Sequence, residues 1–519
     1  MKKTLFFMLA LAAFATLQAQ WVDDPLTNTF IANASADGGE IYLATDEVTG
    51  DTYLQWCQMR ENGWVPTLQR LNFEGVPQWG ADGITITGQQ LATWSQGVAM
   101  AATTDGGVVS CFSNEAGQCI AVRINADGSF AWGEQGIVLF DGQGGSRTEL
   151  LAGDDGGVWA LGADYDNTYL CYIHPDGTTS STITISDSNG KSCVFGLMVP
   201  GIDNSVFVVY EKETWAYTYY YEKEIWVVGY TREGVQIGPE EQLMSAQTIG
   251  GSFIHYVVPD GLGGGYAYIW HPAFGNAFNI YVFHFDHNGH STISDLNGIP
   301  VHSQDPENFY LDAYATVDPE SHELIIVYER TDAMTQSESS VYMNRITSTG
   351  EKPWGDGISV AGNVGTNYSD LFVDAFEDGN GFMVSYNVNM SGMTSVFAIG
   401  YDMQGDQSWA KNMSVGTCNR AMCENSTGFH LGQNIIAWVN SSNGGIYGQN
   451  IGPNGTMGTI ENGIEEQTND EIVSILKIFN VNGQSIAAKN LEELGTGLYI
   501  LQGLTQDGKL VSKKIVVNK

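Results

Sequence analysis

Short apolar runs separated by glycine turns recur along most of this chain and predict β-strands. Apolar residues are interleaved with polar ones over 68–73 and 120–125, and turns follow at Gly75 and Gly128. Alternation with period two is typical of strands with one buried face, and Gly readily adopts the positive φ of tight hairpin turns. Because a useful 3.6-residue period is missing from the repeat region, the pattern argues against helical repeats.

The turn glycine is followed by a Trp in four places. The pairs are Gly75 and Trp79, Gly128 and Trp132, Gly350 and Trp354, and Gly405 and Trp409. We expect each Trp to open the strand that returns from the turn. Because the Trp recurs at the same place in each copy, we interpret the four as packing residues rather than as a ligand signature.

The turn glycine can be followed through eight units. It stands at positions 75, 128, 177, 234, 289, 350, 405 and 455, with spacings of 53, 49, 57, 55, 61, 55 and 50 residues. In the second unit, four strands are predicted over 97–103, 107–113, 119–125 and 130–140. Four antiparallel strands in a repeated unit of about 50 residues are typical of a β-propeller blade. We predict an all-β chain.

The eighth unit is short of one strand, and residues 26–35 form a strand that belongs to no unit. An N-terminal strand that completes the last blade would close the ring and remove its open edges. We therefore favour eight four-stranded blades over residues 21–460, with seven blades as the alternative.

Composition and charge limit the classes of partner that this protein is expected to bind. The 519 residues carry 59 acids and 21 bases, a formal net charge of −38, and 43% of them are hydrophobic. Such a charge repels phosphate backbones, so nucleic acid is not an expected partner. The Asp- and Gly-rich turns leave calcium possible, but they lack the spacing of an EF-hand, and we predict no metal site and no cofactor.

Residues 1–20 are typical of a signal peptide. Two lysines precede an apolar run, and cleavage is expected after Ala19. No other apolar run is long enough for a transmembrane segment. Two pairs of nearby cysteines, Cys111 with Cys119 and Cys418 with Cys423, would form disulfides in an exported protein or be buried free thiols. Both alternatives stay open.

The composition shifts after residue 461. A linker over 461–470 precedes three predicted strands in 471–519, which we interpret as a small β-sandwich. Three segments of this tail, 477–486, 497–501 and 513–519, resemble the C-terminal sorting domain of the type IX secretion system of Bacteroidetes. The Pro-Asn-Pro opening of that family is replaced here by 462–466.

The resemblance implies export to the cell surface, or release from it, through the type IX machinery, followed by removal of the tail. The residues that carry the sorting motif are Gly497, Tyr499, Lys513 and Lys514.

One aromatic stretch departs from the repeat and is the candidate binding surface. Alternation places Trp215, Tyr217, Tyr219 and Tyr221 on one face of a hairpin, and Trp226 follows. Aromatic faces with polar edges suit sugar stacking or a protein contact, although packing between blades is the other interpretation.

A second cluster, His284, Asp286, His287 and His290, has residue types that bind metals but is better explained as an ordinary hairpin tip. No nucleophile or phosphate-binding motif is present.

These patterns predict an exported propeller that binds a glycan or a surface protein without catalysing a reaction. A polysaccharide hydrolase with its site at the propeller axis is one alternative, and a structural component of the surface layer is another. A hydrolase would need two facing carboxylates, which the sequence does not single out among 59 acids.

Overall fold

The computed structural model describes 20 segments of the chain. They are residues 21–34, 41–60, 63–88, 90–91, 98–140, 147–217, 220–250, 256–273, 277–303, 305, 307–334, 339–362, 367–390, 393–418, 425–440, 444–458, 474–480, 485–486, 497–504 and 510–517. The signal peptide predicted over 1–20 and the linker predicted over 461–470 lie outside these segments. The chain divides into two compact units, Met1–Thr459 and Ile460–Lys519.

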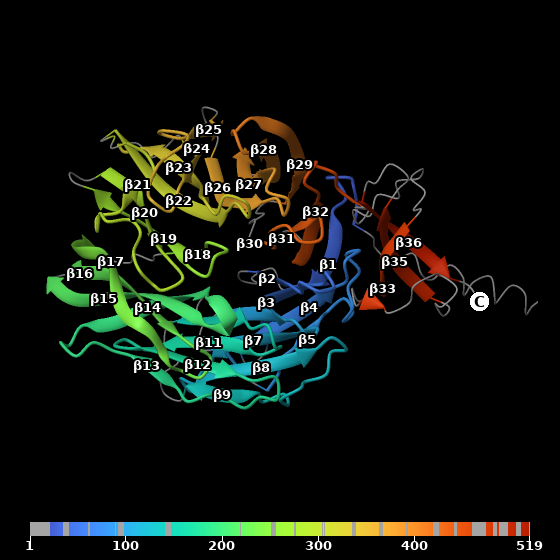
Figure 1. Cartoon of the computed structure of the whole chain (residues 1–519), viewed down its shortest axis with the longest axis horizontal. Coiled ribbons are helices and arrows are strands. Elements are labelled where there is room, and N and C mark those ends of the chain that lie inside the picture. The colour runs from blue at the N-terminus through green and yellow to red at the C-terminus, as the bar shows by residue number, and fades with distance from the viewer. Residues whose placement is uncertain are drawn as a thin grey trace, which may run out of the picture. The chain divides into compact units, whose positions relative to one another are not determined.

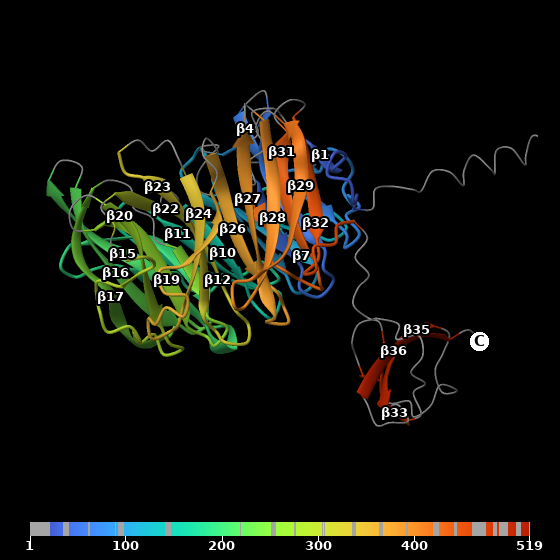
Figure 2. The same ribbon diagram turned by 90° about the horizontal axis from the view of Figure 1, so that it is seen from above.

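The first unit is an eight-bladed β-propeller, as predicted (Figure 1). Each blade is a four-stranded antiparallel sheet, and the first strands of successive blades contact one another around the whole ring. Buried apolar side chains fill the spaces between neighbouring sheets, because one face of a blade packs on the preceding blade and the other face on the next blade. Strands of blades six to eight stand side by side in Figure 2.

We number the blades one to eight in chain order. Blade one contains β2 (Tyr42–Thr45), β3 (Thr52–Arg60), β4 (Gly63–Leu71) and β5 (Ile84–Thr85). Blade two contains β6 (Val98–Thr103), β7 (Gly107–Ser113), β8 (Cys119–Asn125) and β9 (Ile137–Phe140). Blade three contains β10 (Arg147–Ala152), β11 (Val158–Ala163), β12 (Thr168–Ile173) and β13 (Ile183–Ile185). Blade four contains β14 (Ser192–Pro200), β15 (Val206–Tyr217), β16 (Tyr220–Tyr230) and β17 (Gln236–Gly250), with a short 3-10 turn η2 (Ile202–Asn204).

The other four blades repeat this order. Blade five contains β18 (Tyr256–Pro259), β19 (Gly265–Ala273), β20 (Ala277–Phe285) and β21 (Ile299–Pro300). Blade six contains β22 (Asn308–Val317), β23 (Leu324–Asp332), β24 (Ser339–Ile346) and β25 (Ile358–Ala361). Blade seven contains β26 (Asn367–Ala375), β27 (Gly381–Met390), β28 (Met393–Asp402) and β29 (Gln407–Cys418). Blade eight contains β30 (Asn425–Ser426), β31 (Asn434–Asn440), β32 (Gly445–Ile451) and β1 (Thr29–Asn33).

The N-terminal strand closes the ring, as the sequence predicts. β1 pairs antiparallel with β32 and so supplies the outermost strand of blade eight. Just before it, Trp21 is buried and donates its indole N–H to the carbonyl of Phe73 in blade one, at 3.1 Å. The two ends of the propeller sequence are therefore joined by strand pairing and by one aromatic contact.

The recurrent Trp residues join neighbouring blades. Trp79, Trp132 and Trp409 each donate the indole N–H to a carbonyl in the glycine turn of the next blade, at 3.2, 3.2 and 2.7 Å. Their rings lie against the turn glycine, where a Cβ would collide with the indole at Gly177 and Gly455. Trp21 makes the same contact with Gly75. These contacts fit the interpretation of the repeat as a joint between blades.

The prediction that the Trp opens the returning strand is wrong for three of the four copies. Trp79, Trp132 and Trp354 lie in turns, and the fourth strand begins several residues later, at Ile84, Ile137 and Ile358. Glycines that follow the Trp delay the strand, because they also have positive φ, as at Gly133 with φ 80° and Gly136 with φ 63°. Trp354 packs near Phe382 with ring centroids 5.8 Å apart, and Ile358 takes its place against the next turn glycine.

The thiols of Cys111 and Cys119 are free, which is the second of the two alternatives left open by the sequence. Their sulfur atoms lie 3.3 Å apart, and both side chains are fully buried between blades two and three. The hydrogen bond between the two thiols, together with burial, holds the pKa of the Cys119 thiol well above its ordinary value. Cys423 lies outside the described residues, as does the side chain of Cys418.

The described residues of the second unit form one antiparallel sheet. Its strands are β33 (Ser474–Asn480), β34 (Ser485–Ile486), β35 (Gly497–Leu504) and β36 (Leu510–Val517), in the order β34-β33-β35-β36. A β-sandwich needs a second sheet packed on the first, and the described residues of this unit form only one, so the sandwich stays a prediction. Throughout the described part of the chain, no helix is long and apolar enough to span a membrane.

Candidate functional site

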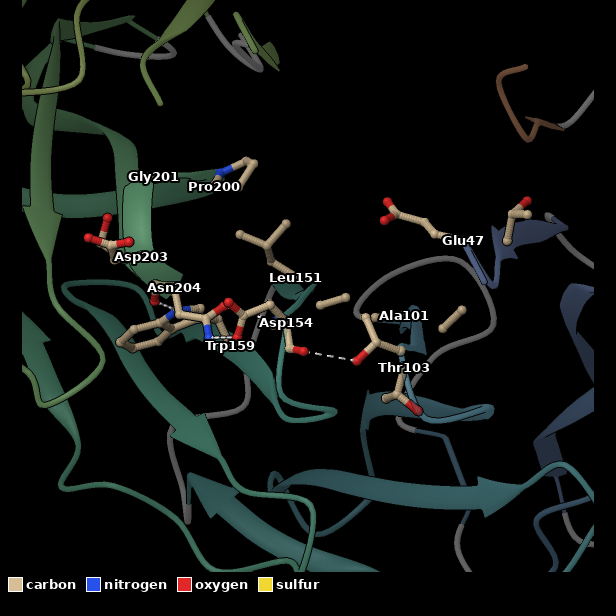
Figure 3. Close-up of a pocket in the computed structure, with 16 residues that line it drawn as sticks. Glu47, Ala101, Thr103, Leu151, Asp154, Trp159, Pro200, Gly201, Asp203 and Asn204 are labelled. Carbon is tan, nitrogen blue, oxygen red and sulfur yellow. Dashed lines mark hydrogen bonds between the residues drawn. The ribbon is translucent and has the colours of Figure 1, made fainter. Parts of the chain in front are cut away.

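A polar cavity lies where the first strands of blades one to four end. Its volume is about 420 Å³, and it is lined by the ends of β2, β6, β10 and β14 together with the turns that follow them. Figure 3 shows Glu47 on one side of the opening, with Asp203, Asn204 and Trp159 on the other. Cavities of this size hold small molecules or one end of a longer ligand.

Hydrogen bonds between successive blades fix the wall of the cavity. Thr104 of blade two donates its hydroxyl to the backbone carbonyl of Asp154 in blade three, at 3.3 Å. The Asp154 N–H donates to Oδ1 of Asn204 in blade four at 2.8 Å, and the Asn204 amide also donates to the Asp154 carboxylate. Trp159 donates its indole N–H to the Asn204 carbonyl at 3.0 Å. The wall is therefore held in place before any ligand arrives.

The sequence of the turn in blade four explains its shape. Asp203 and Asn204 have positive φ, 56° and 59°, and Asp and Asn are the non-glycine residues that adopt this conformation most readily. This left-handed pair stands in a short turn that begins at Ile202 and ends before Ser205. The turn exposes the Asp203 side chain and directs Asn204 to the hydrogen bonds described above.

Charge sets the chemistry of the cavity. Three exposed carboxylates line it, Glu47, Asp154 and Asp203, and the described lining residues include no Lys, Arg or His. Hydroxyl groups of Thr45 and Thr104 add hydrogen-bonding positions. An anionic ligand would be repelled, whereas a neutral polyhydroxyl ligand or a cation fits.

A separate group of carboxylates lies on the innermost strands of blades six and seven. Asp312 in β22 and Asp370 in β26 each stand at a bulge with positive φ, 45° and 51°. Burial raises the pKa of Asp312, and the neighbouring charge of Asp370 raises it further. Burial also raises the pKa of Glu329, against the hydrogen bond from Ser339.

Hydrogen bonds hold the Asp370 side chain in place. Its Oδ2 accepts from the amide of Asn387 at 2.7 Å and from the hydroxyl of Ser369 at 2.8 Å. Asn387 is fully buried, so this contact fixes the carboxylate to the body of blade seven. One carboxyl group with a raised pKa beside a fixed neighbour is an arrangement that general acid–base chemistry can use.

The predicted aromatic surface is only partly brought together. Trp215 and Tyr221 lie opposite each other in β15 and β16 with ring centroids 5.7 Å apart, and Trp215 is 66% exposed. Trp226 pairs with Tyr210 and points to the other face of the sheet, where the Lys212 ammonium lies 4.0 Å from its ring centroid. Tyr219 and the side chain of Tyr217 lie outside the described residues.

The histidine cluster is split between structural roles. His284 is buried and lies between Asp260, at 3.2 Å from Nε2, and the Thr292 hydroxyl, at 2.7 Å from Nδ1. His287 contacts the side chain of Asn288 at the exposed turn. In the described residues, no three or more His, Cys, Asp or Glu side chains are grouped so that they would hold a metal ion.

The residues of the predicted sorting motif lie in the second unit. Gly497 and Tyr499 are in β35, and Lys513 and Lys514 are in β36, where Leu501 pairs with Lys513 and Ile500 with Lys514. Their side chains are outside the described part, so the structure gives them a place in the sheet and no contacts.

Sequence reasoning missed the residues that line the cavity and the two bulge aspartates. The turns that hold Glu47, Asp154 and Asp203 contain six, five and five residues, and the three acids stand at the second, second and third positions, so no common spacing marks them. Asp312 and Asp370 carry a usable signal, because each stands five residues before the end of the first strand of its blade. Their shared position becomes visible only when the blades are aligned on the ends of their first strands.

Comparison with known proteins gives similarity of fold only. No family model matches the chain, and no curated protein matches it. Among solved structures, the polysaccharide lyase Uly1 matches at 9% identity with a TM-score of 0.44, over 85% of this chain and 94% of that one. The WD40 domain of SCAP from fission yeast matches at 10% identity with a TM-score of 0.44, over 82% and 97%.

A third structure, of an ulvan lyase, matches at 10% identity with a TM-score of 0.38, over 85% of this chain and 98% of that one. Similarity this low does not indicate what the present chain binds, so the site is interpreted from its own residues.

Proposed function

We propose that this protein is an exported, non-catalytic propeller that binds a glycan in the cavity of blades one to four. The observation that carries the proposal is the cavity itself, about 420 Å³ in volume and lined by hydroxyl, amide and carboxylate groups together with apolar residues such as Leu151 and Trp159. Such groups both donate and accept hydrogen bonds, as sugar hydroxyls do. The hydrogen-bonded wall supports the proposal further, because a fixed wall lowers the entropic cost of binding.

A blocking substitution tests the location of the site. Ala152 is exposed and lines the cavity at the end of β10, so Ala152→Trp should fill the space without disturbing the core. The matched control is Val138→Trp, because Val138 is 51% exposed on β9, an outermost strand. A glycan array identifies binders for the purified protein, and calorimetry then measures each variant.

We expect Ala152→Trp to weaken binding at least about tenfold, equivalent to about 1.4 kcal/mol, and Val138→Trp to leave it unchanged. Equal binding by both variants would move the site elsewhere, for example to the surface of Trp215 and Tyr221. If the array finds no glycan while a surface protein is bound, the protein-binding alternative replaces this proposal.

The proposal includes the route to the surface. The signal-like residues 1–20 and the resemblance of the tail to a sorting domain support export through the type IX machinery of a Bacteroidetes cell. Deleting residues 471–519 should leave the protein in the periplasm, still able to bind its glycan, whereas the intact chain reaches the surface. Surface delivery of the truncated chain, measured by protease access to whole cells, would refute this part of the proposal.

The second candidate function is hydrolysis of a polysaccharide at the axis. One observation favours it, the raised pKa of Asp312 beside the fixed Asp370 carboxylate. A hydrolase would release reducing sugar from the glycans that it binds, and Asp312→Asn and Asp370→Asn would each abolish that release while leaving binding intact. Binding without release of sugar by the unaltered protein supports the non-catalytic proposal instead.

A further inference from the structure

Apart from Asp46, which is buried and accepts hydrogen bonds from the backbone N–H groups of Val48 and Thr49, the other acids at the first turns of blades one to three differ from the three carboxylates of the cavity. Asp51 pairs with Arg70, Asp105 with Arg123 at 2.5 Å, and Asp155 with Arg232 at 2.8 Å. Each of those acids therefore has a cation beside it. The turns use their acids to tie strands together within a blade or to a neighbouring one, which is a structural role.

Glu47, Asp154 and Asp203 have no such cation among the described residues that line the cavity. Asp154 accepts a hydrogen bond from Asn204, which is neutral and leaves the carboxylate charge uncompensated. The three acids come from blades one, three and four and meet at one concave opening (Figure 3). Carboxylates around a concave surface add their fields inside it.

We propose that the glycan held in this cavity carries free amino groups, so that its ammonium ions bind to Glu47 and Asp203. The inference rests on the proposed function and names the class of its ligand. An ammonium group donates three hydrogen bonds, and those to a carboxylate are about twice as strong as bonds between neutral groups. Since the described residues hold no metal-binding group, an organic cation fits the cavity better than a metal ion.

The probes are a glucosamine trimer and its N-acetylated counterpart, which differ in charge and share the sugar backbone. Calorimetry at mildly acidic pH, where the amines are protonated, should show at least about tenfold tighter binding of the glucosamine trimer. Added salt should weaken that binding and leave the binding of the acetylated trimer unchanged, because salt screens charge.

The variant that tests the residues is the double substitution Glu47→Gln with Asp203→Asn. Asn tolerates the left-handed backbone at position 203, so the turn keeps its shape. The matched control, Glu134→Gln with Glu351→Gln, also removes two negative charges, from exposed positions outside the cavity lining. We expect the first variant to lose the preference for the glucosamine trimer and the control to keep it.

Each outcome decides the inference. Equal affinity for the two trimers, or a preference that survives the cavity variant, overturns it while glycan binding itself stands. A preference lost in both variants would show attraction to the net charge of −38 rather than to this site, and also overturns it. Binding of neither trimer, nor of any glycan on the array, overturns both the inference and the proposed function.

Discussion

Replacing Trp21 with Ala tests whether the contacts of this buried side chain with blades one and eight stabilise the closed ring. Trp21 is only 5% exposed, and its ring lies among buried residues of blades eight and one. Its indole N–H donates to the carbonyl of Phe73 at 3.1 Å, so the substitution removes both packing and a hydrogen bond. Large-to-small substitutions of buried aromatic residues cost about 3–5 kcal/mol, and we expect Trp21→Ala to lower the free energy of unfolding by that amount.

The loss would be a large part of the stability of a typical protein, which is about 5–15 kcal/mol. Urea unfolding followed by circular dichroism measures it without depending on tryptophan fluorescence. The control is Trp215→Ala, because Trp215 is 66% exposed and its removal should cost about 0.5 kcal/mol or less. The reasoning fails if Trp21→Ala unfolds at the same urea concentration as the control.

Two further substitutions address a buried acid and a contact between blades. Burial raises the pKa of Asp374 to about 6, so the unfolded chain loses this proton first as pH rises. The free energy of unfolding should therefore fall by about 3 kcal/mol between about pH 4 and pH 6, and urea titrations of Asp374→Asn should lack that component. Arg123 is buried and donates to the carbonyls of Gly156 and Pro175 in blade three at 3.1 and 3.3 Å. Arg123→Met removes these two bonds and the ion pair with Asp105, so it should cost about 2–3 kcal/mol in the same assay, and an unchanged midpoint would show that these interactions together add nothing.

The repeat made the propeller predictable from the sequence. A hairpin turn that needs positive φ selects glycine. All eight turn glycines have a positive φ, between 76° at Gly455 and 87° at Gly350. Closure of the ring was also predictable, because the last unit lacks one strand and the strand predicted over 26–35 belongs to no other unit. The position of Trp79 was misjudged because two further glycines with positive φ, Gly80 and Gly83, extend the turn before the strand begins.

The cavity was not predictable in the same way. It forms where turns of different sequence from four blades meet, so no repeat marks its residues. Pro200 and Gly201 mark a turn in the sequence, but Asp203 and Asn204 are the residues that adopt the left-handed conformation, and the sequence does not predict that. The aromatic surface could be predicted only in part, because the strand register places Trp226 on the face of the sheet opposite Trp215.

The most direct test of the account is a crystal structure of the protein soaked with a sugar that it binds in the array. The account predicts density for the sugar in the cavity, within hydrogen-bonding distance of Glu47 or Asp203 and against the wall held by Asn204. Density found only on Trp215 and Tyr221, or only beside Asp312 and Asp370, with an empty cavity, would contradict it.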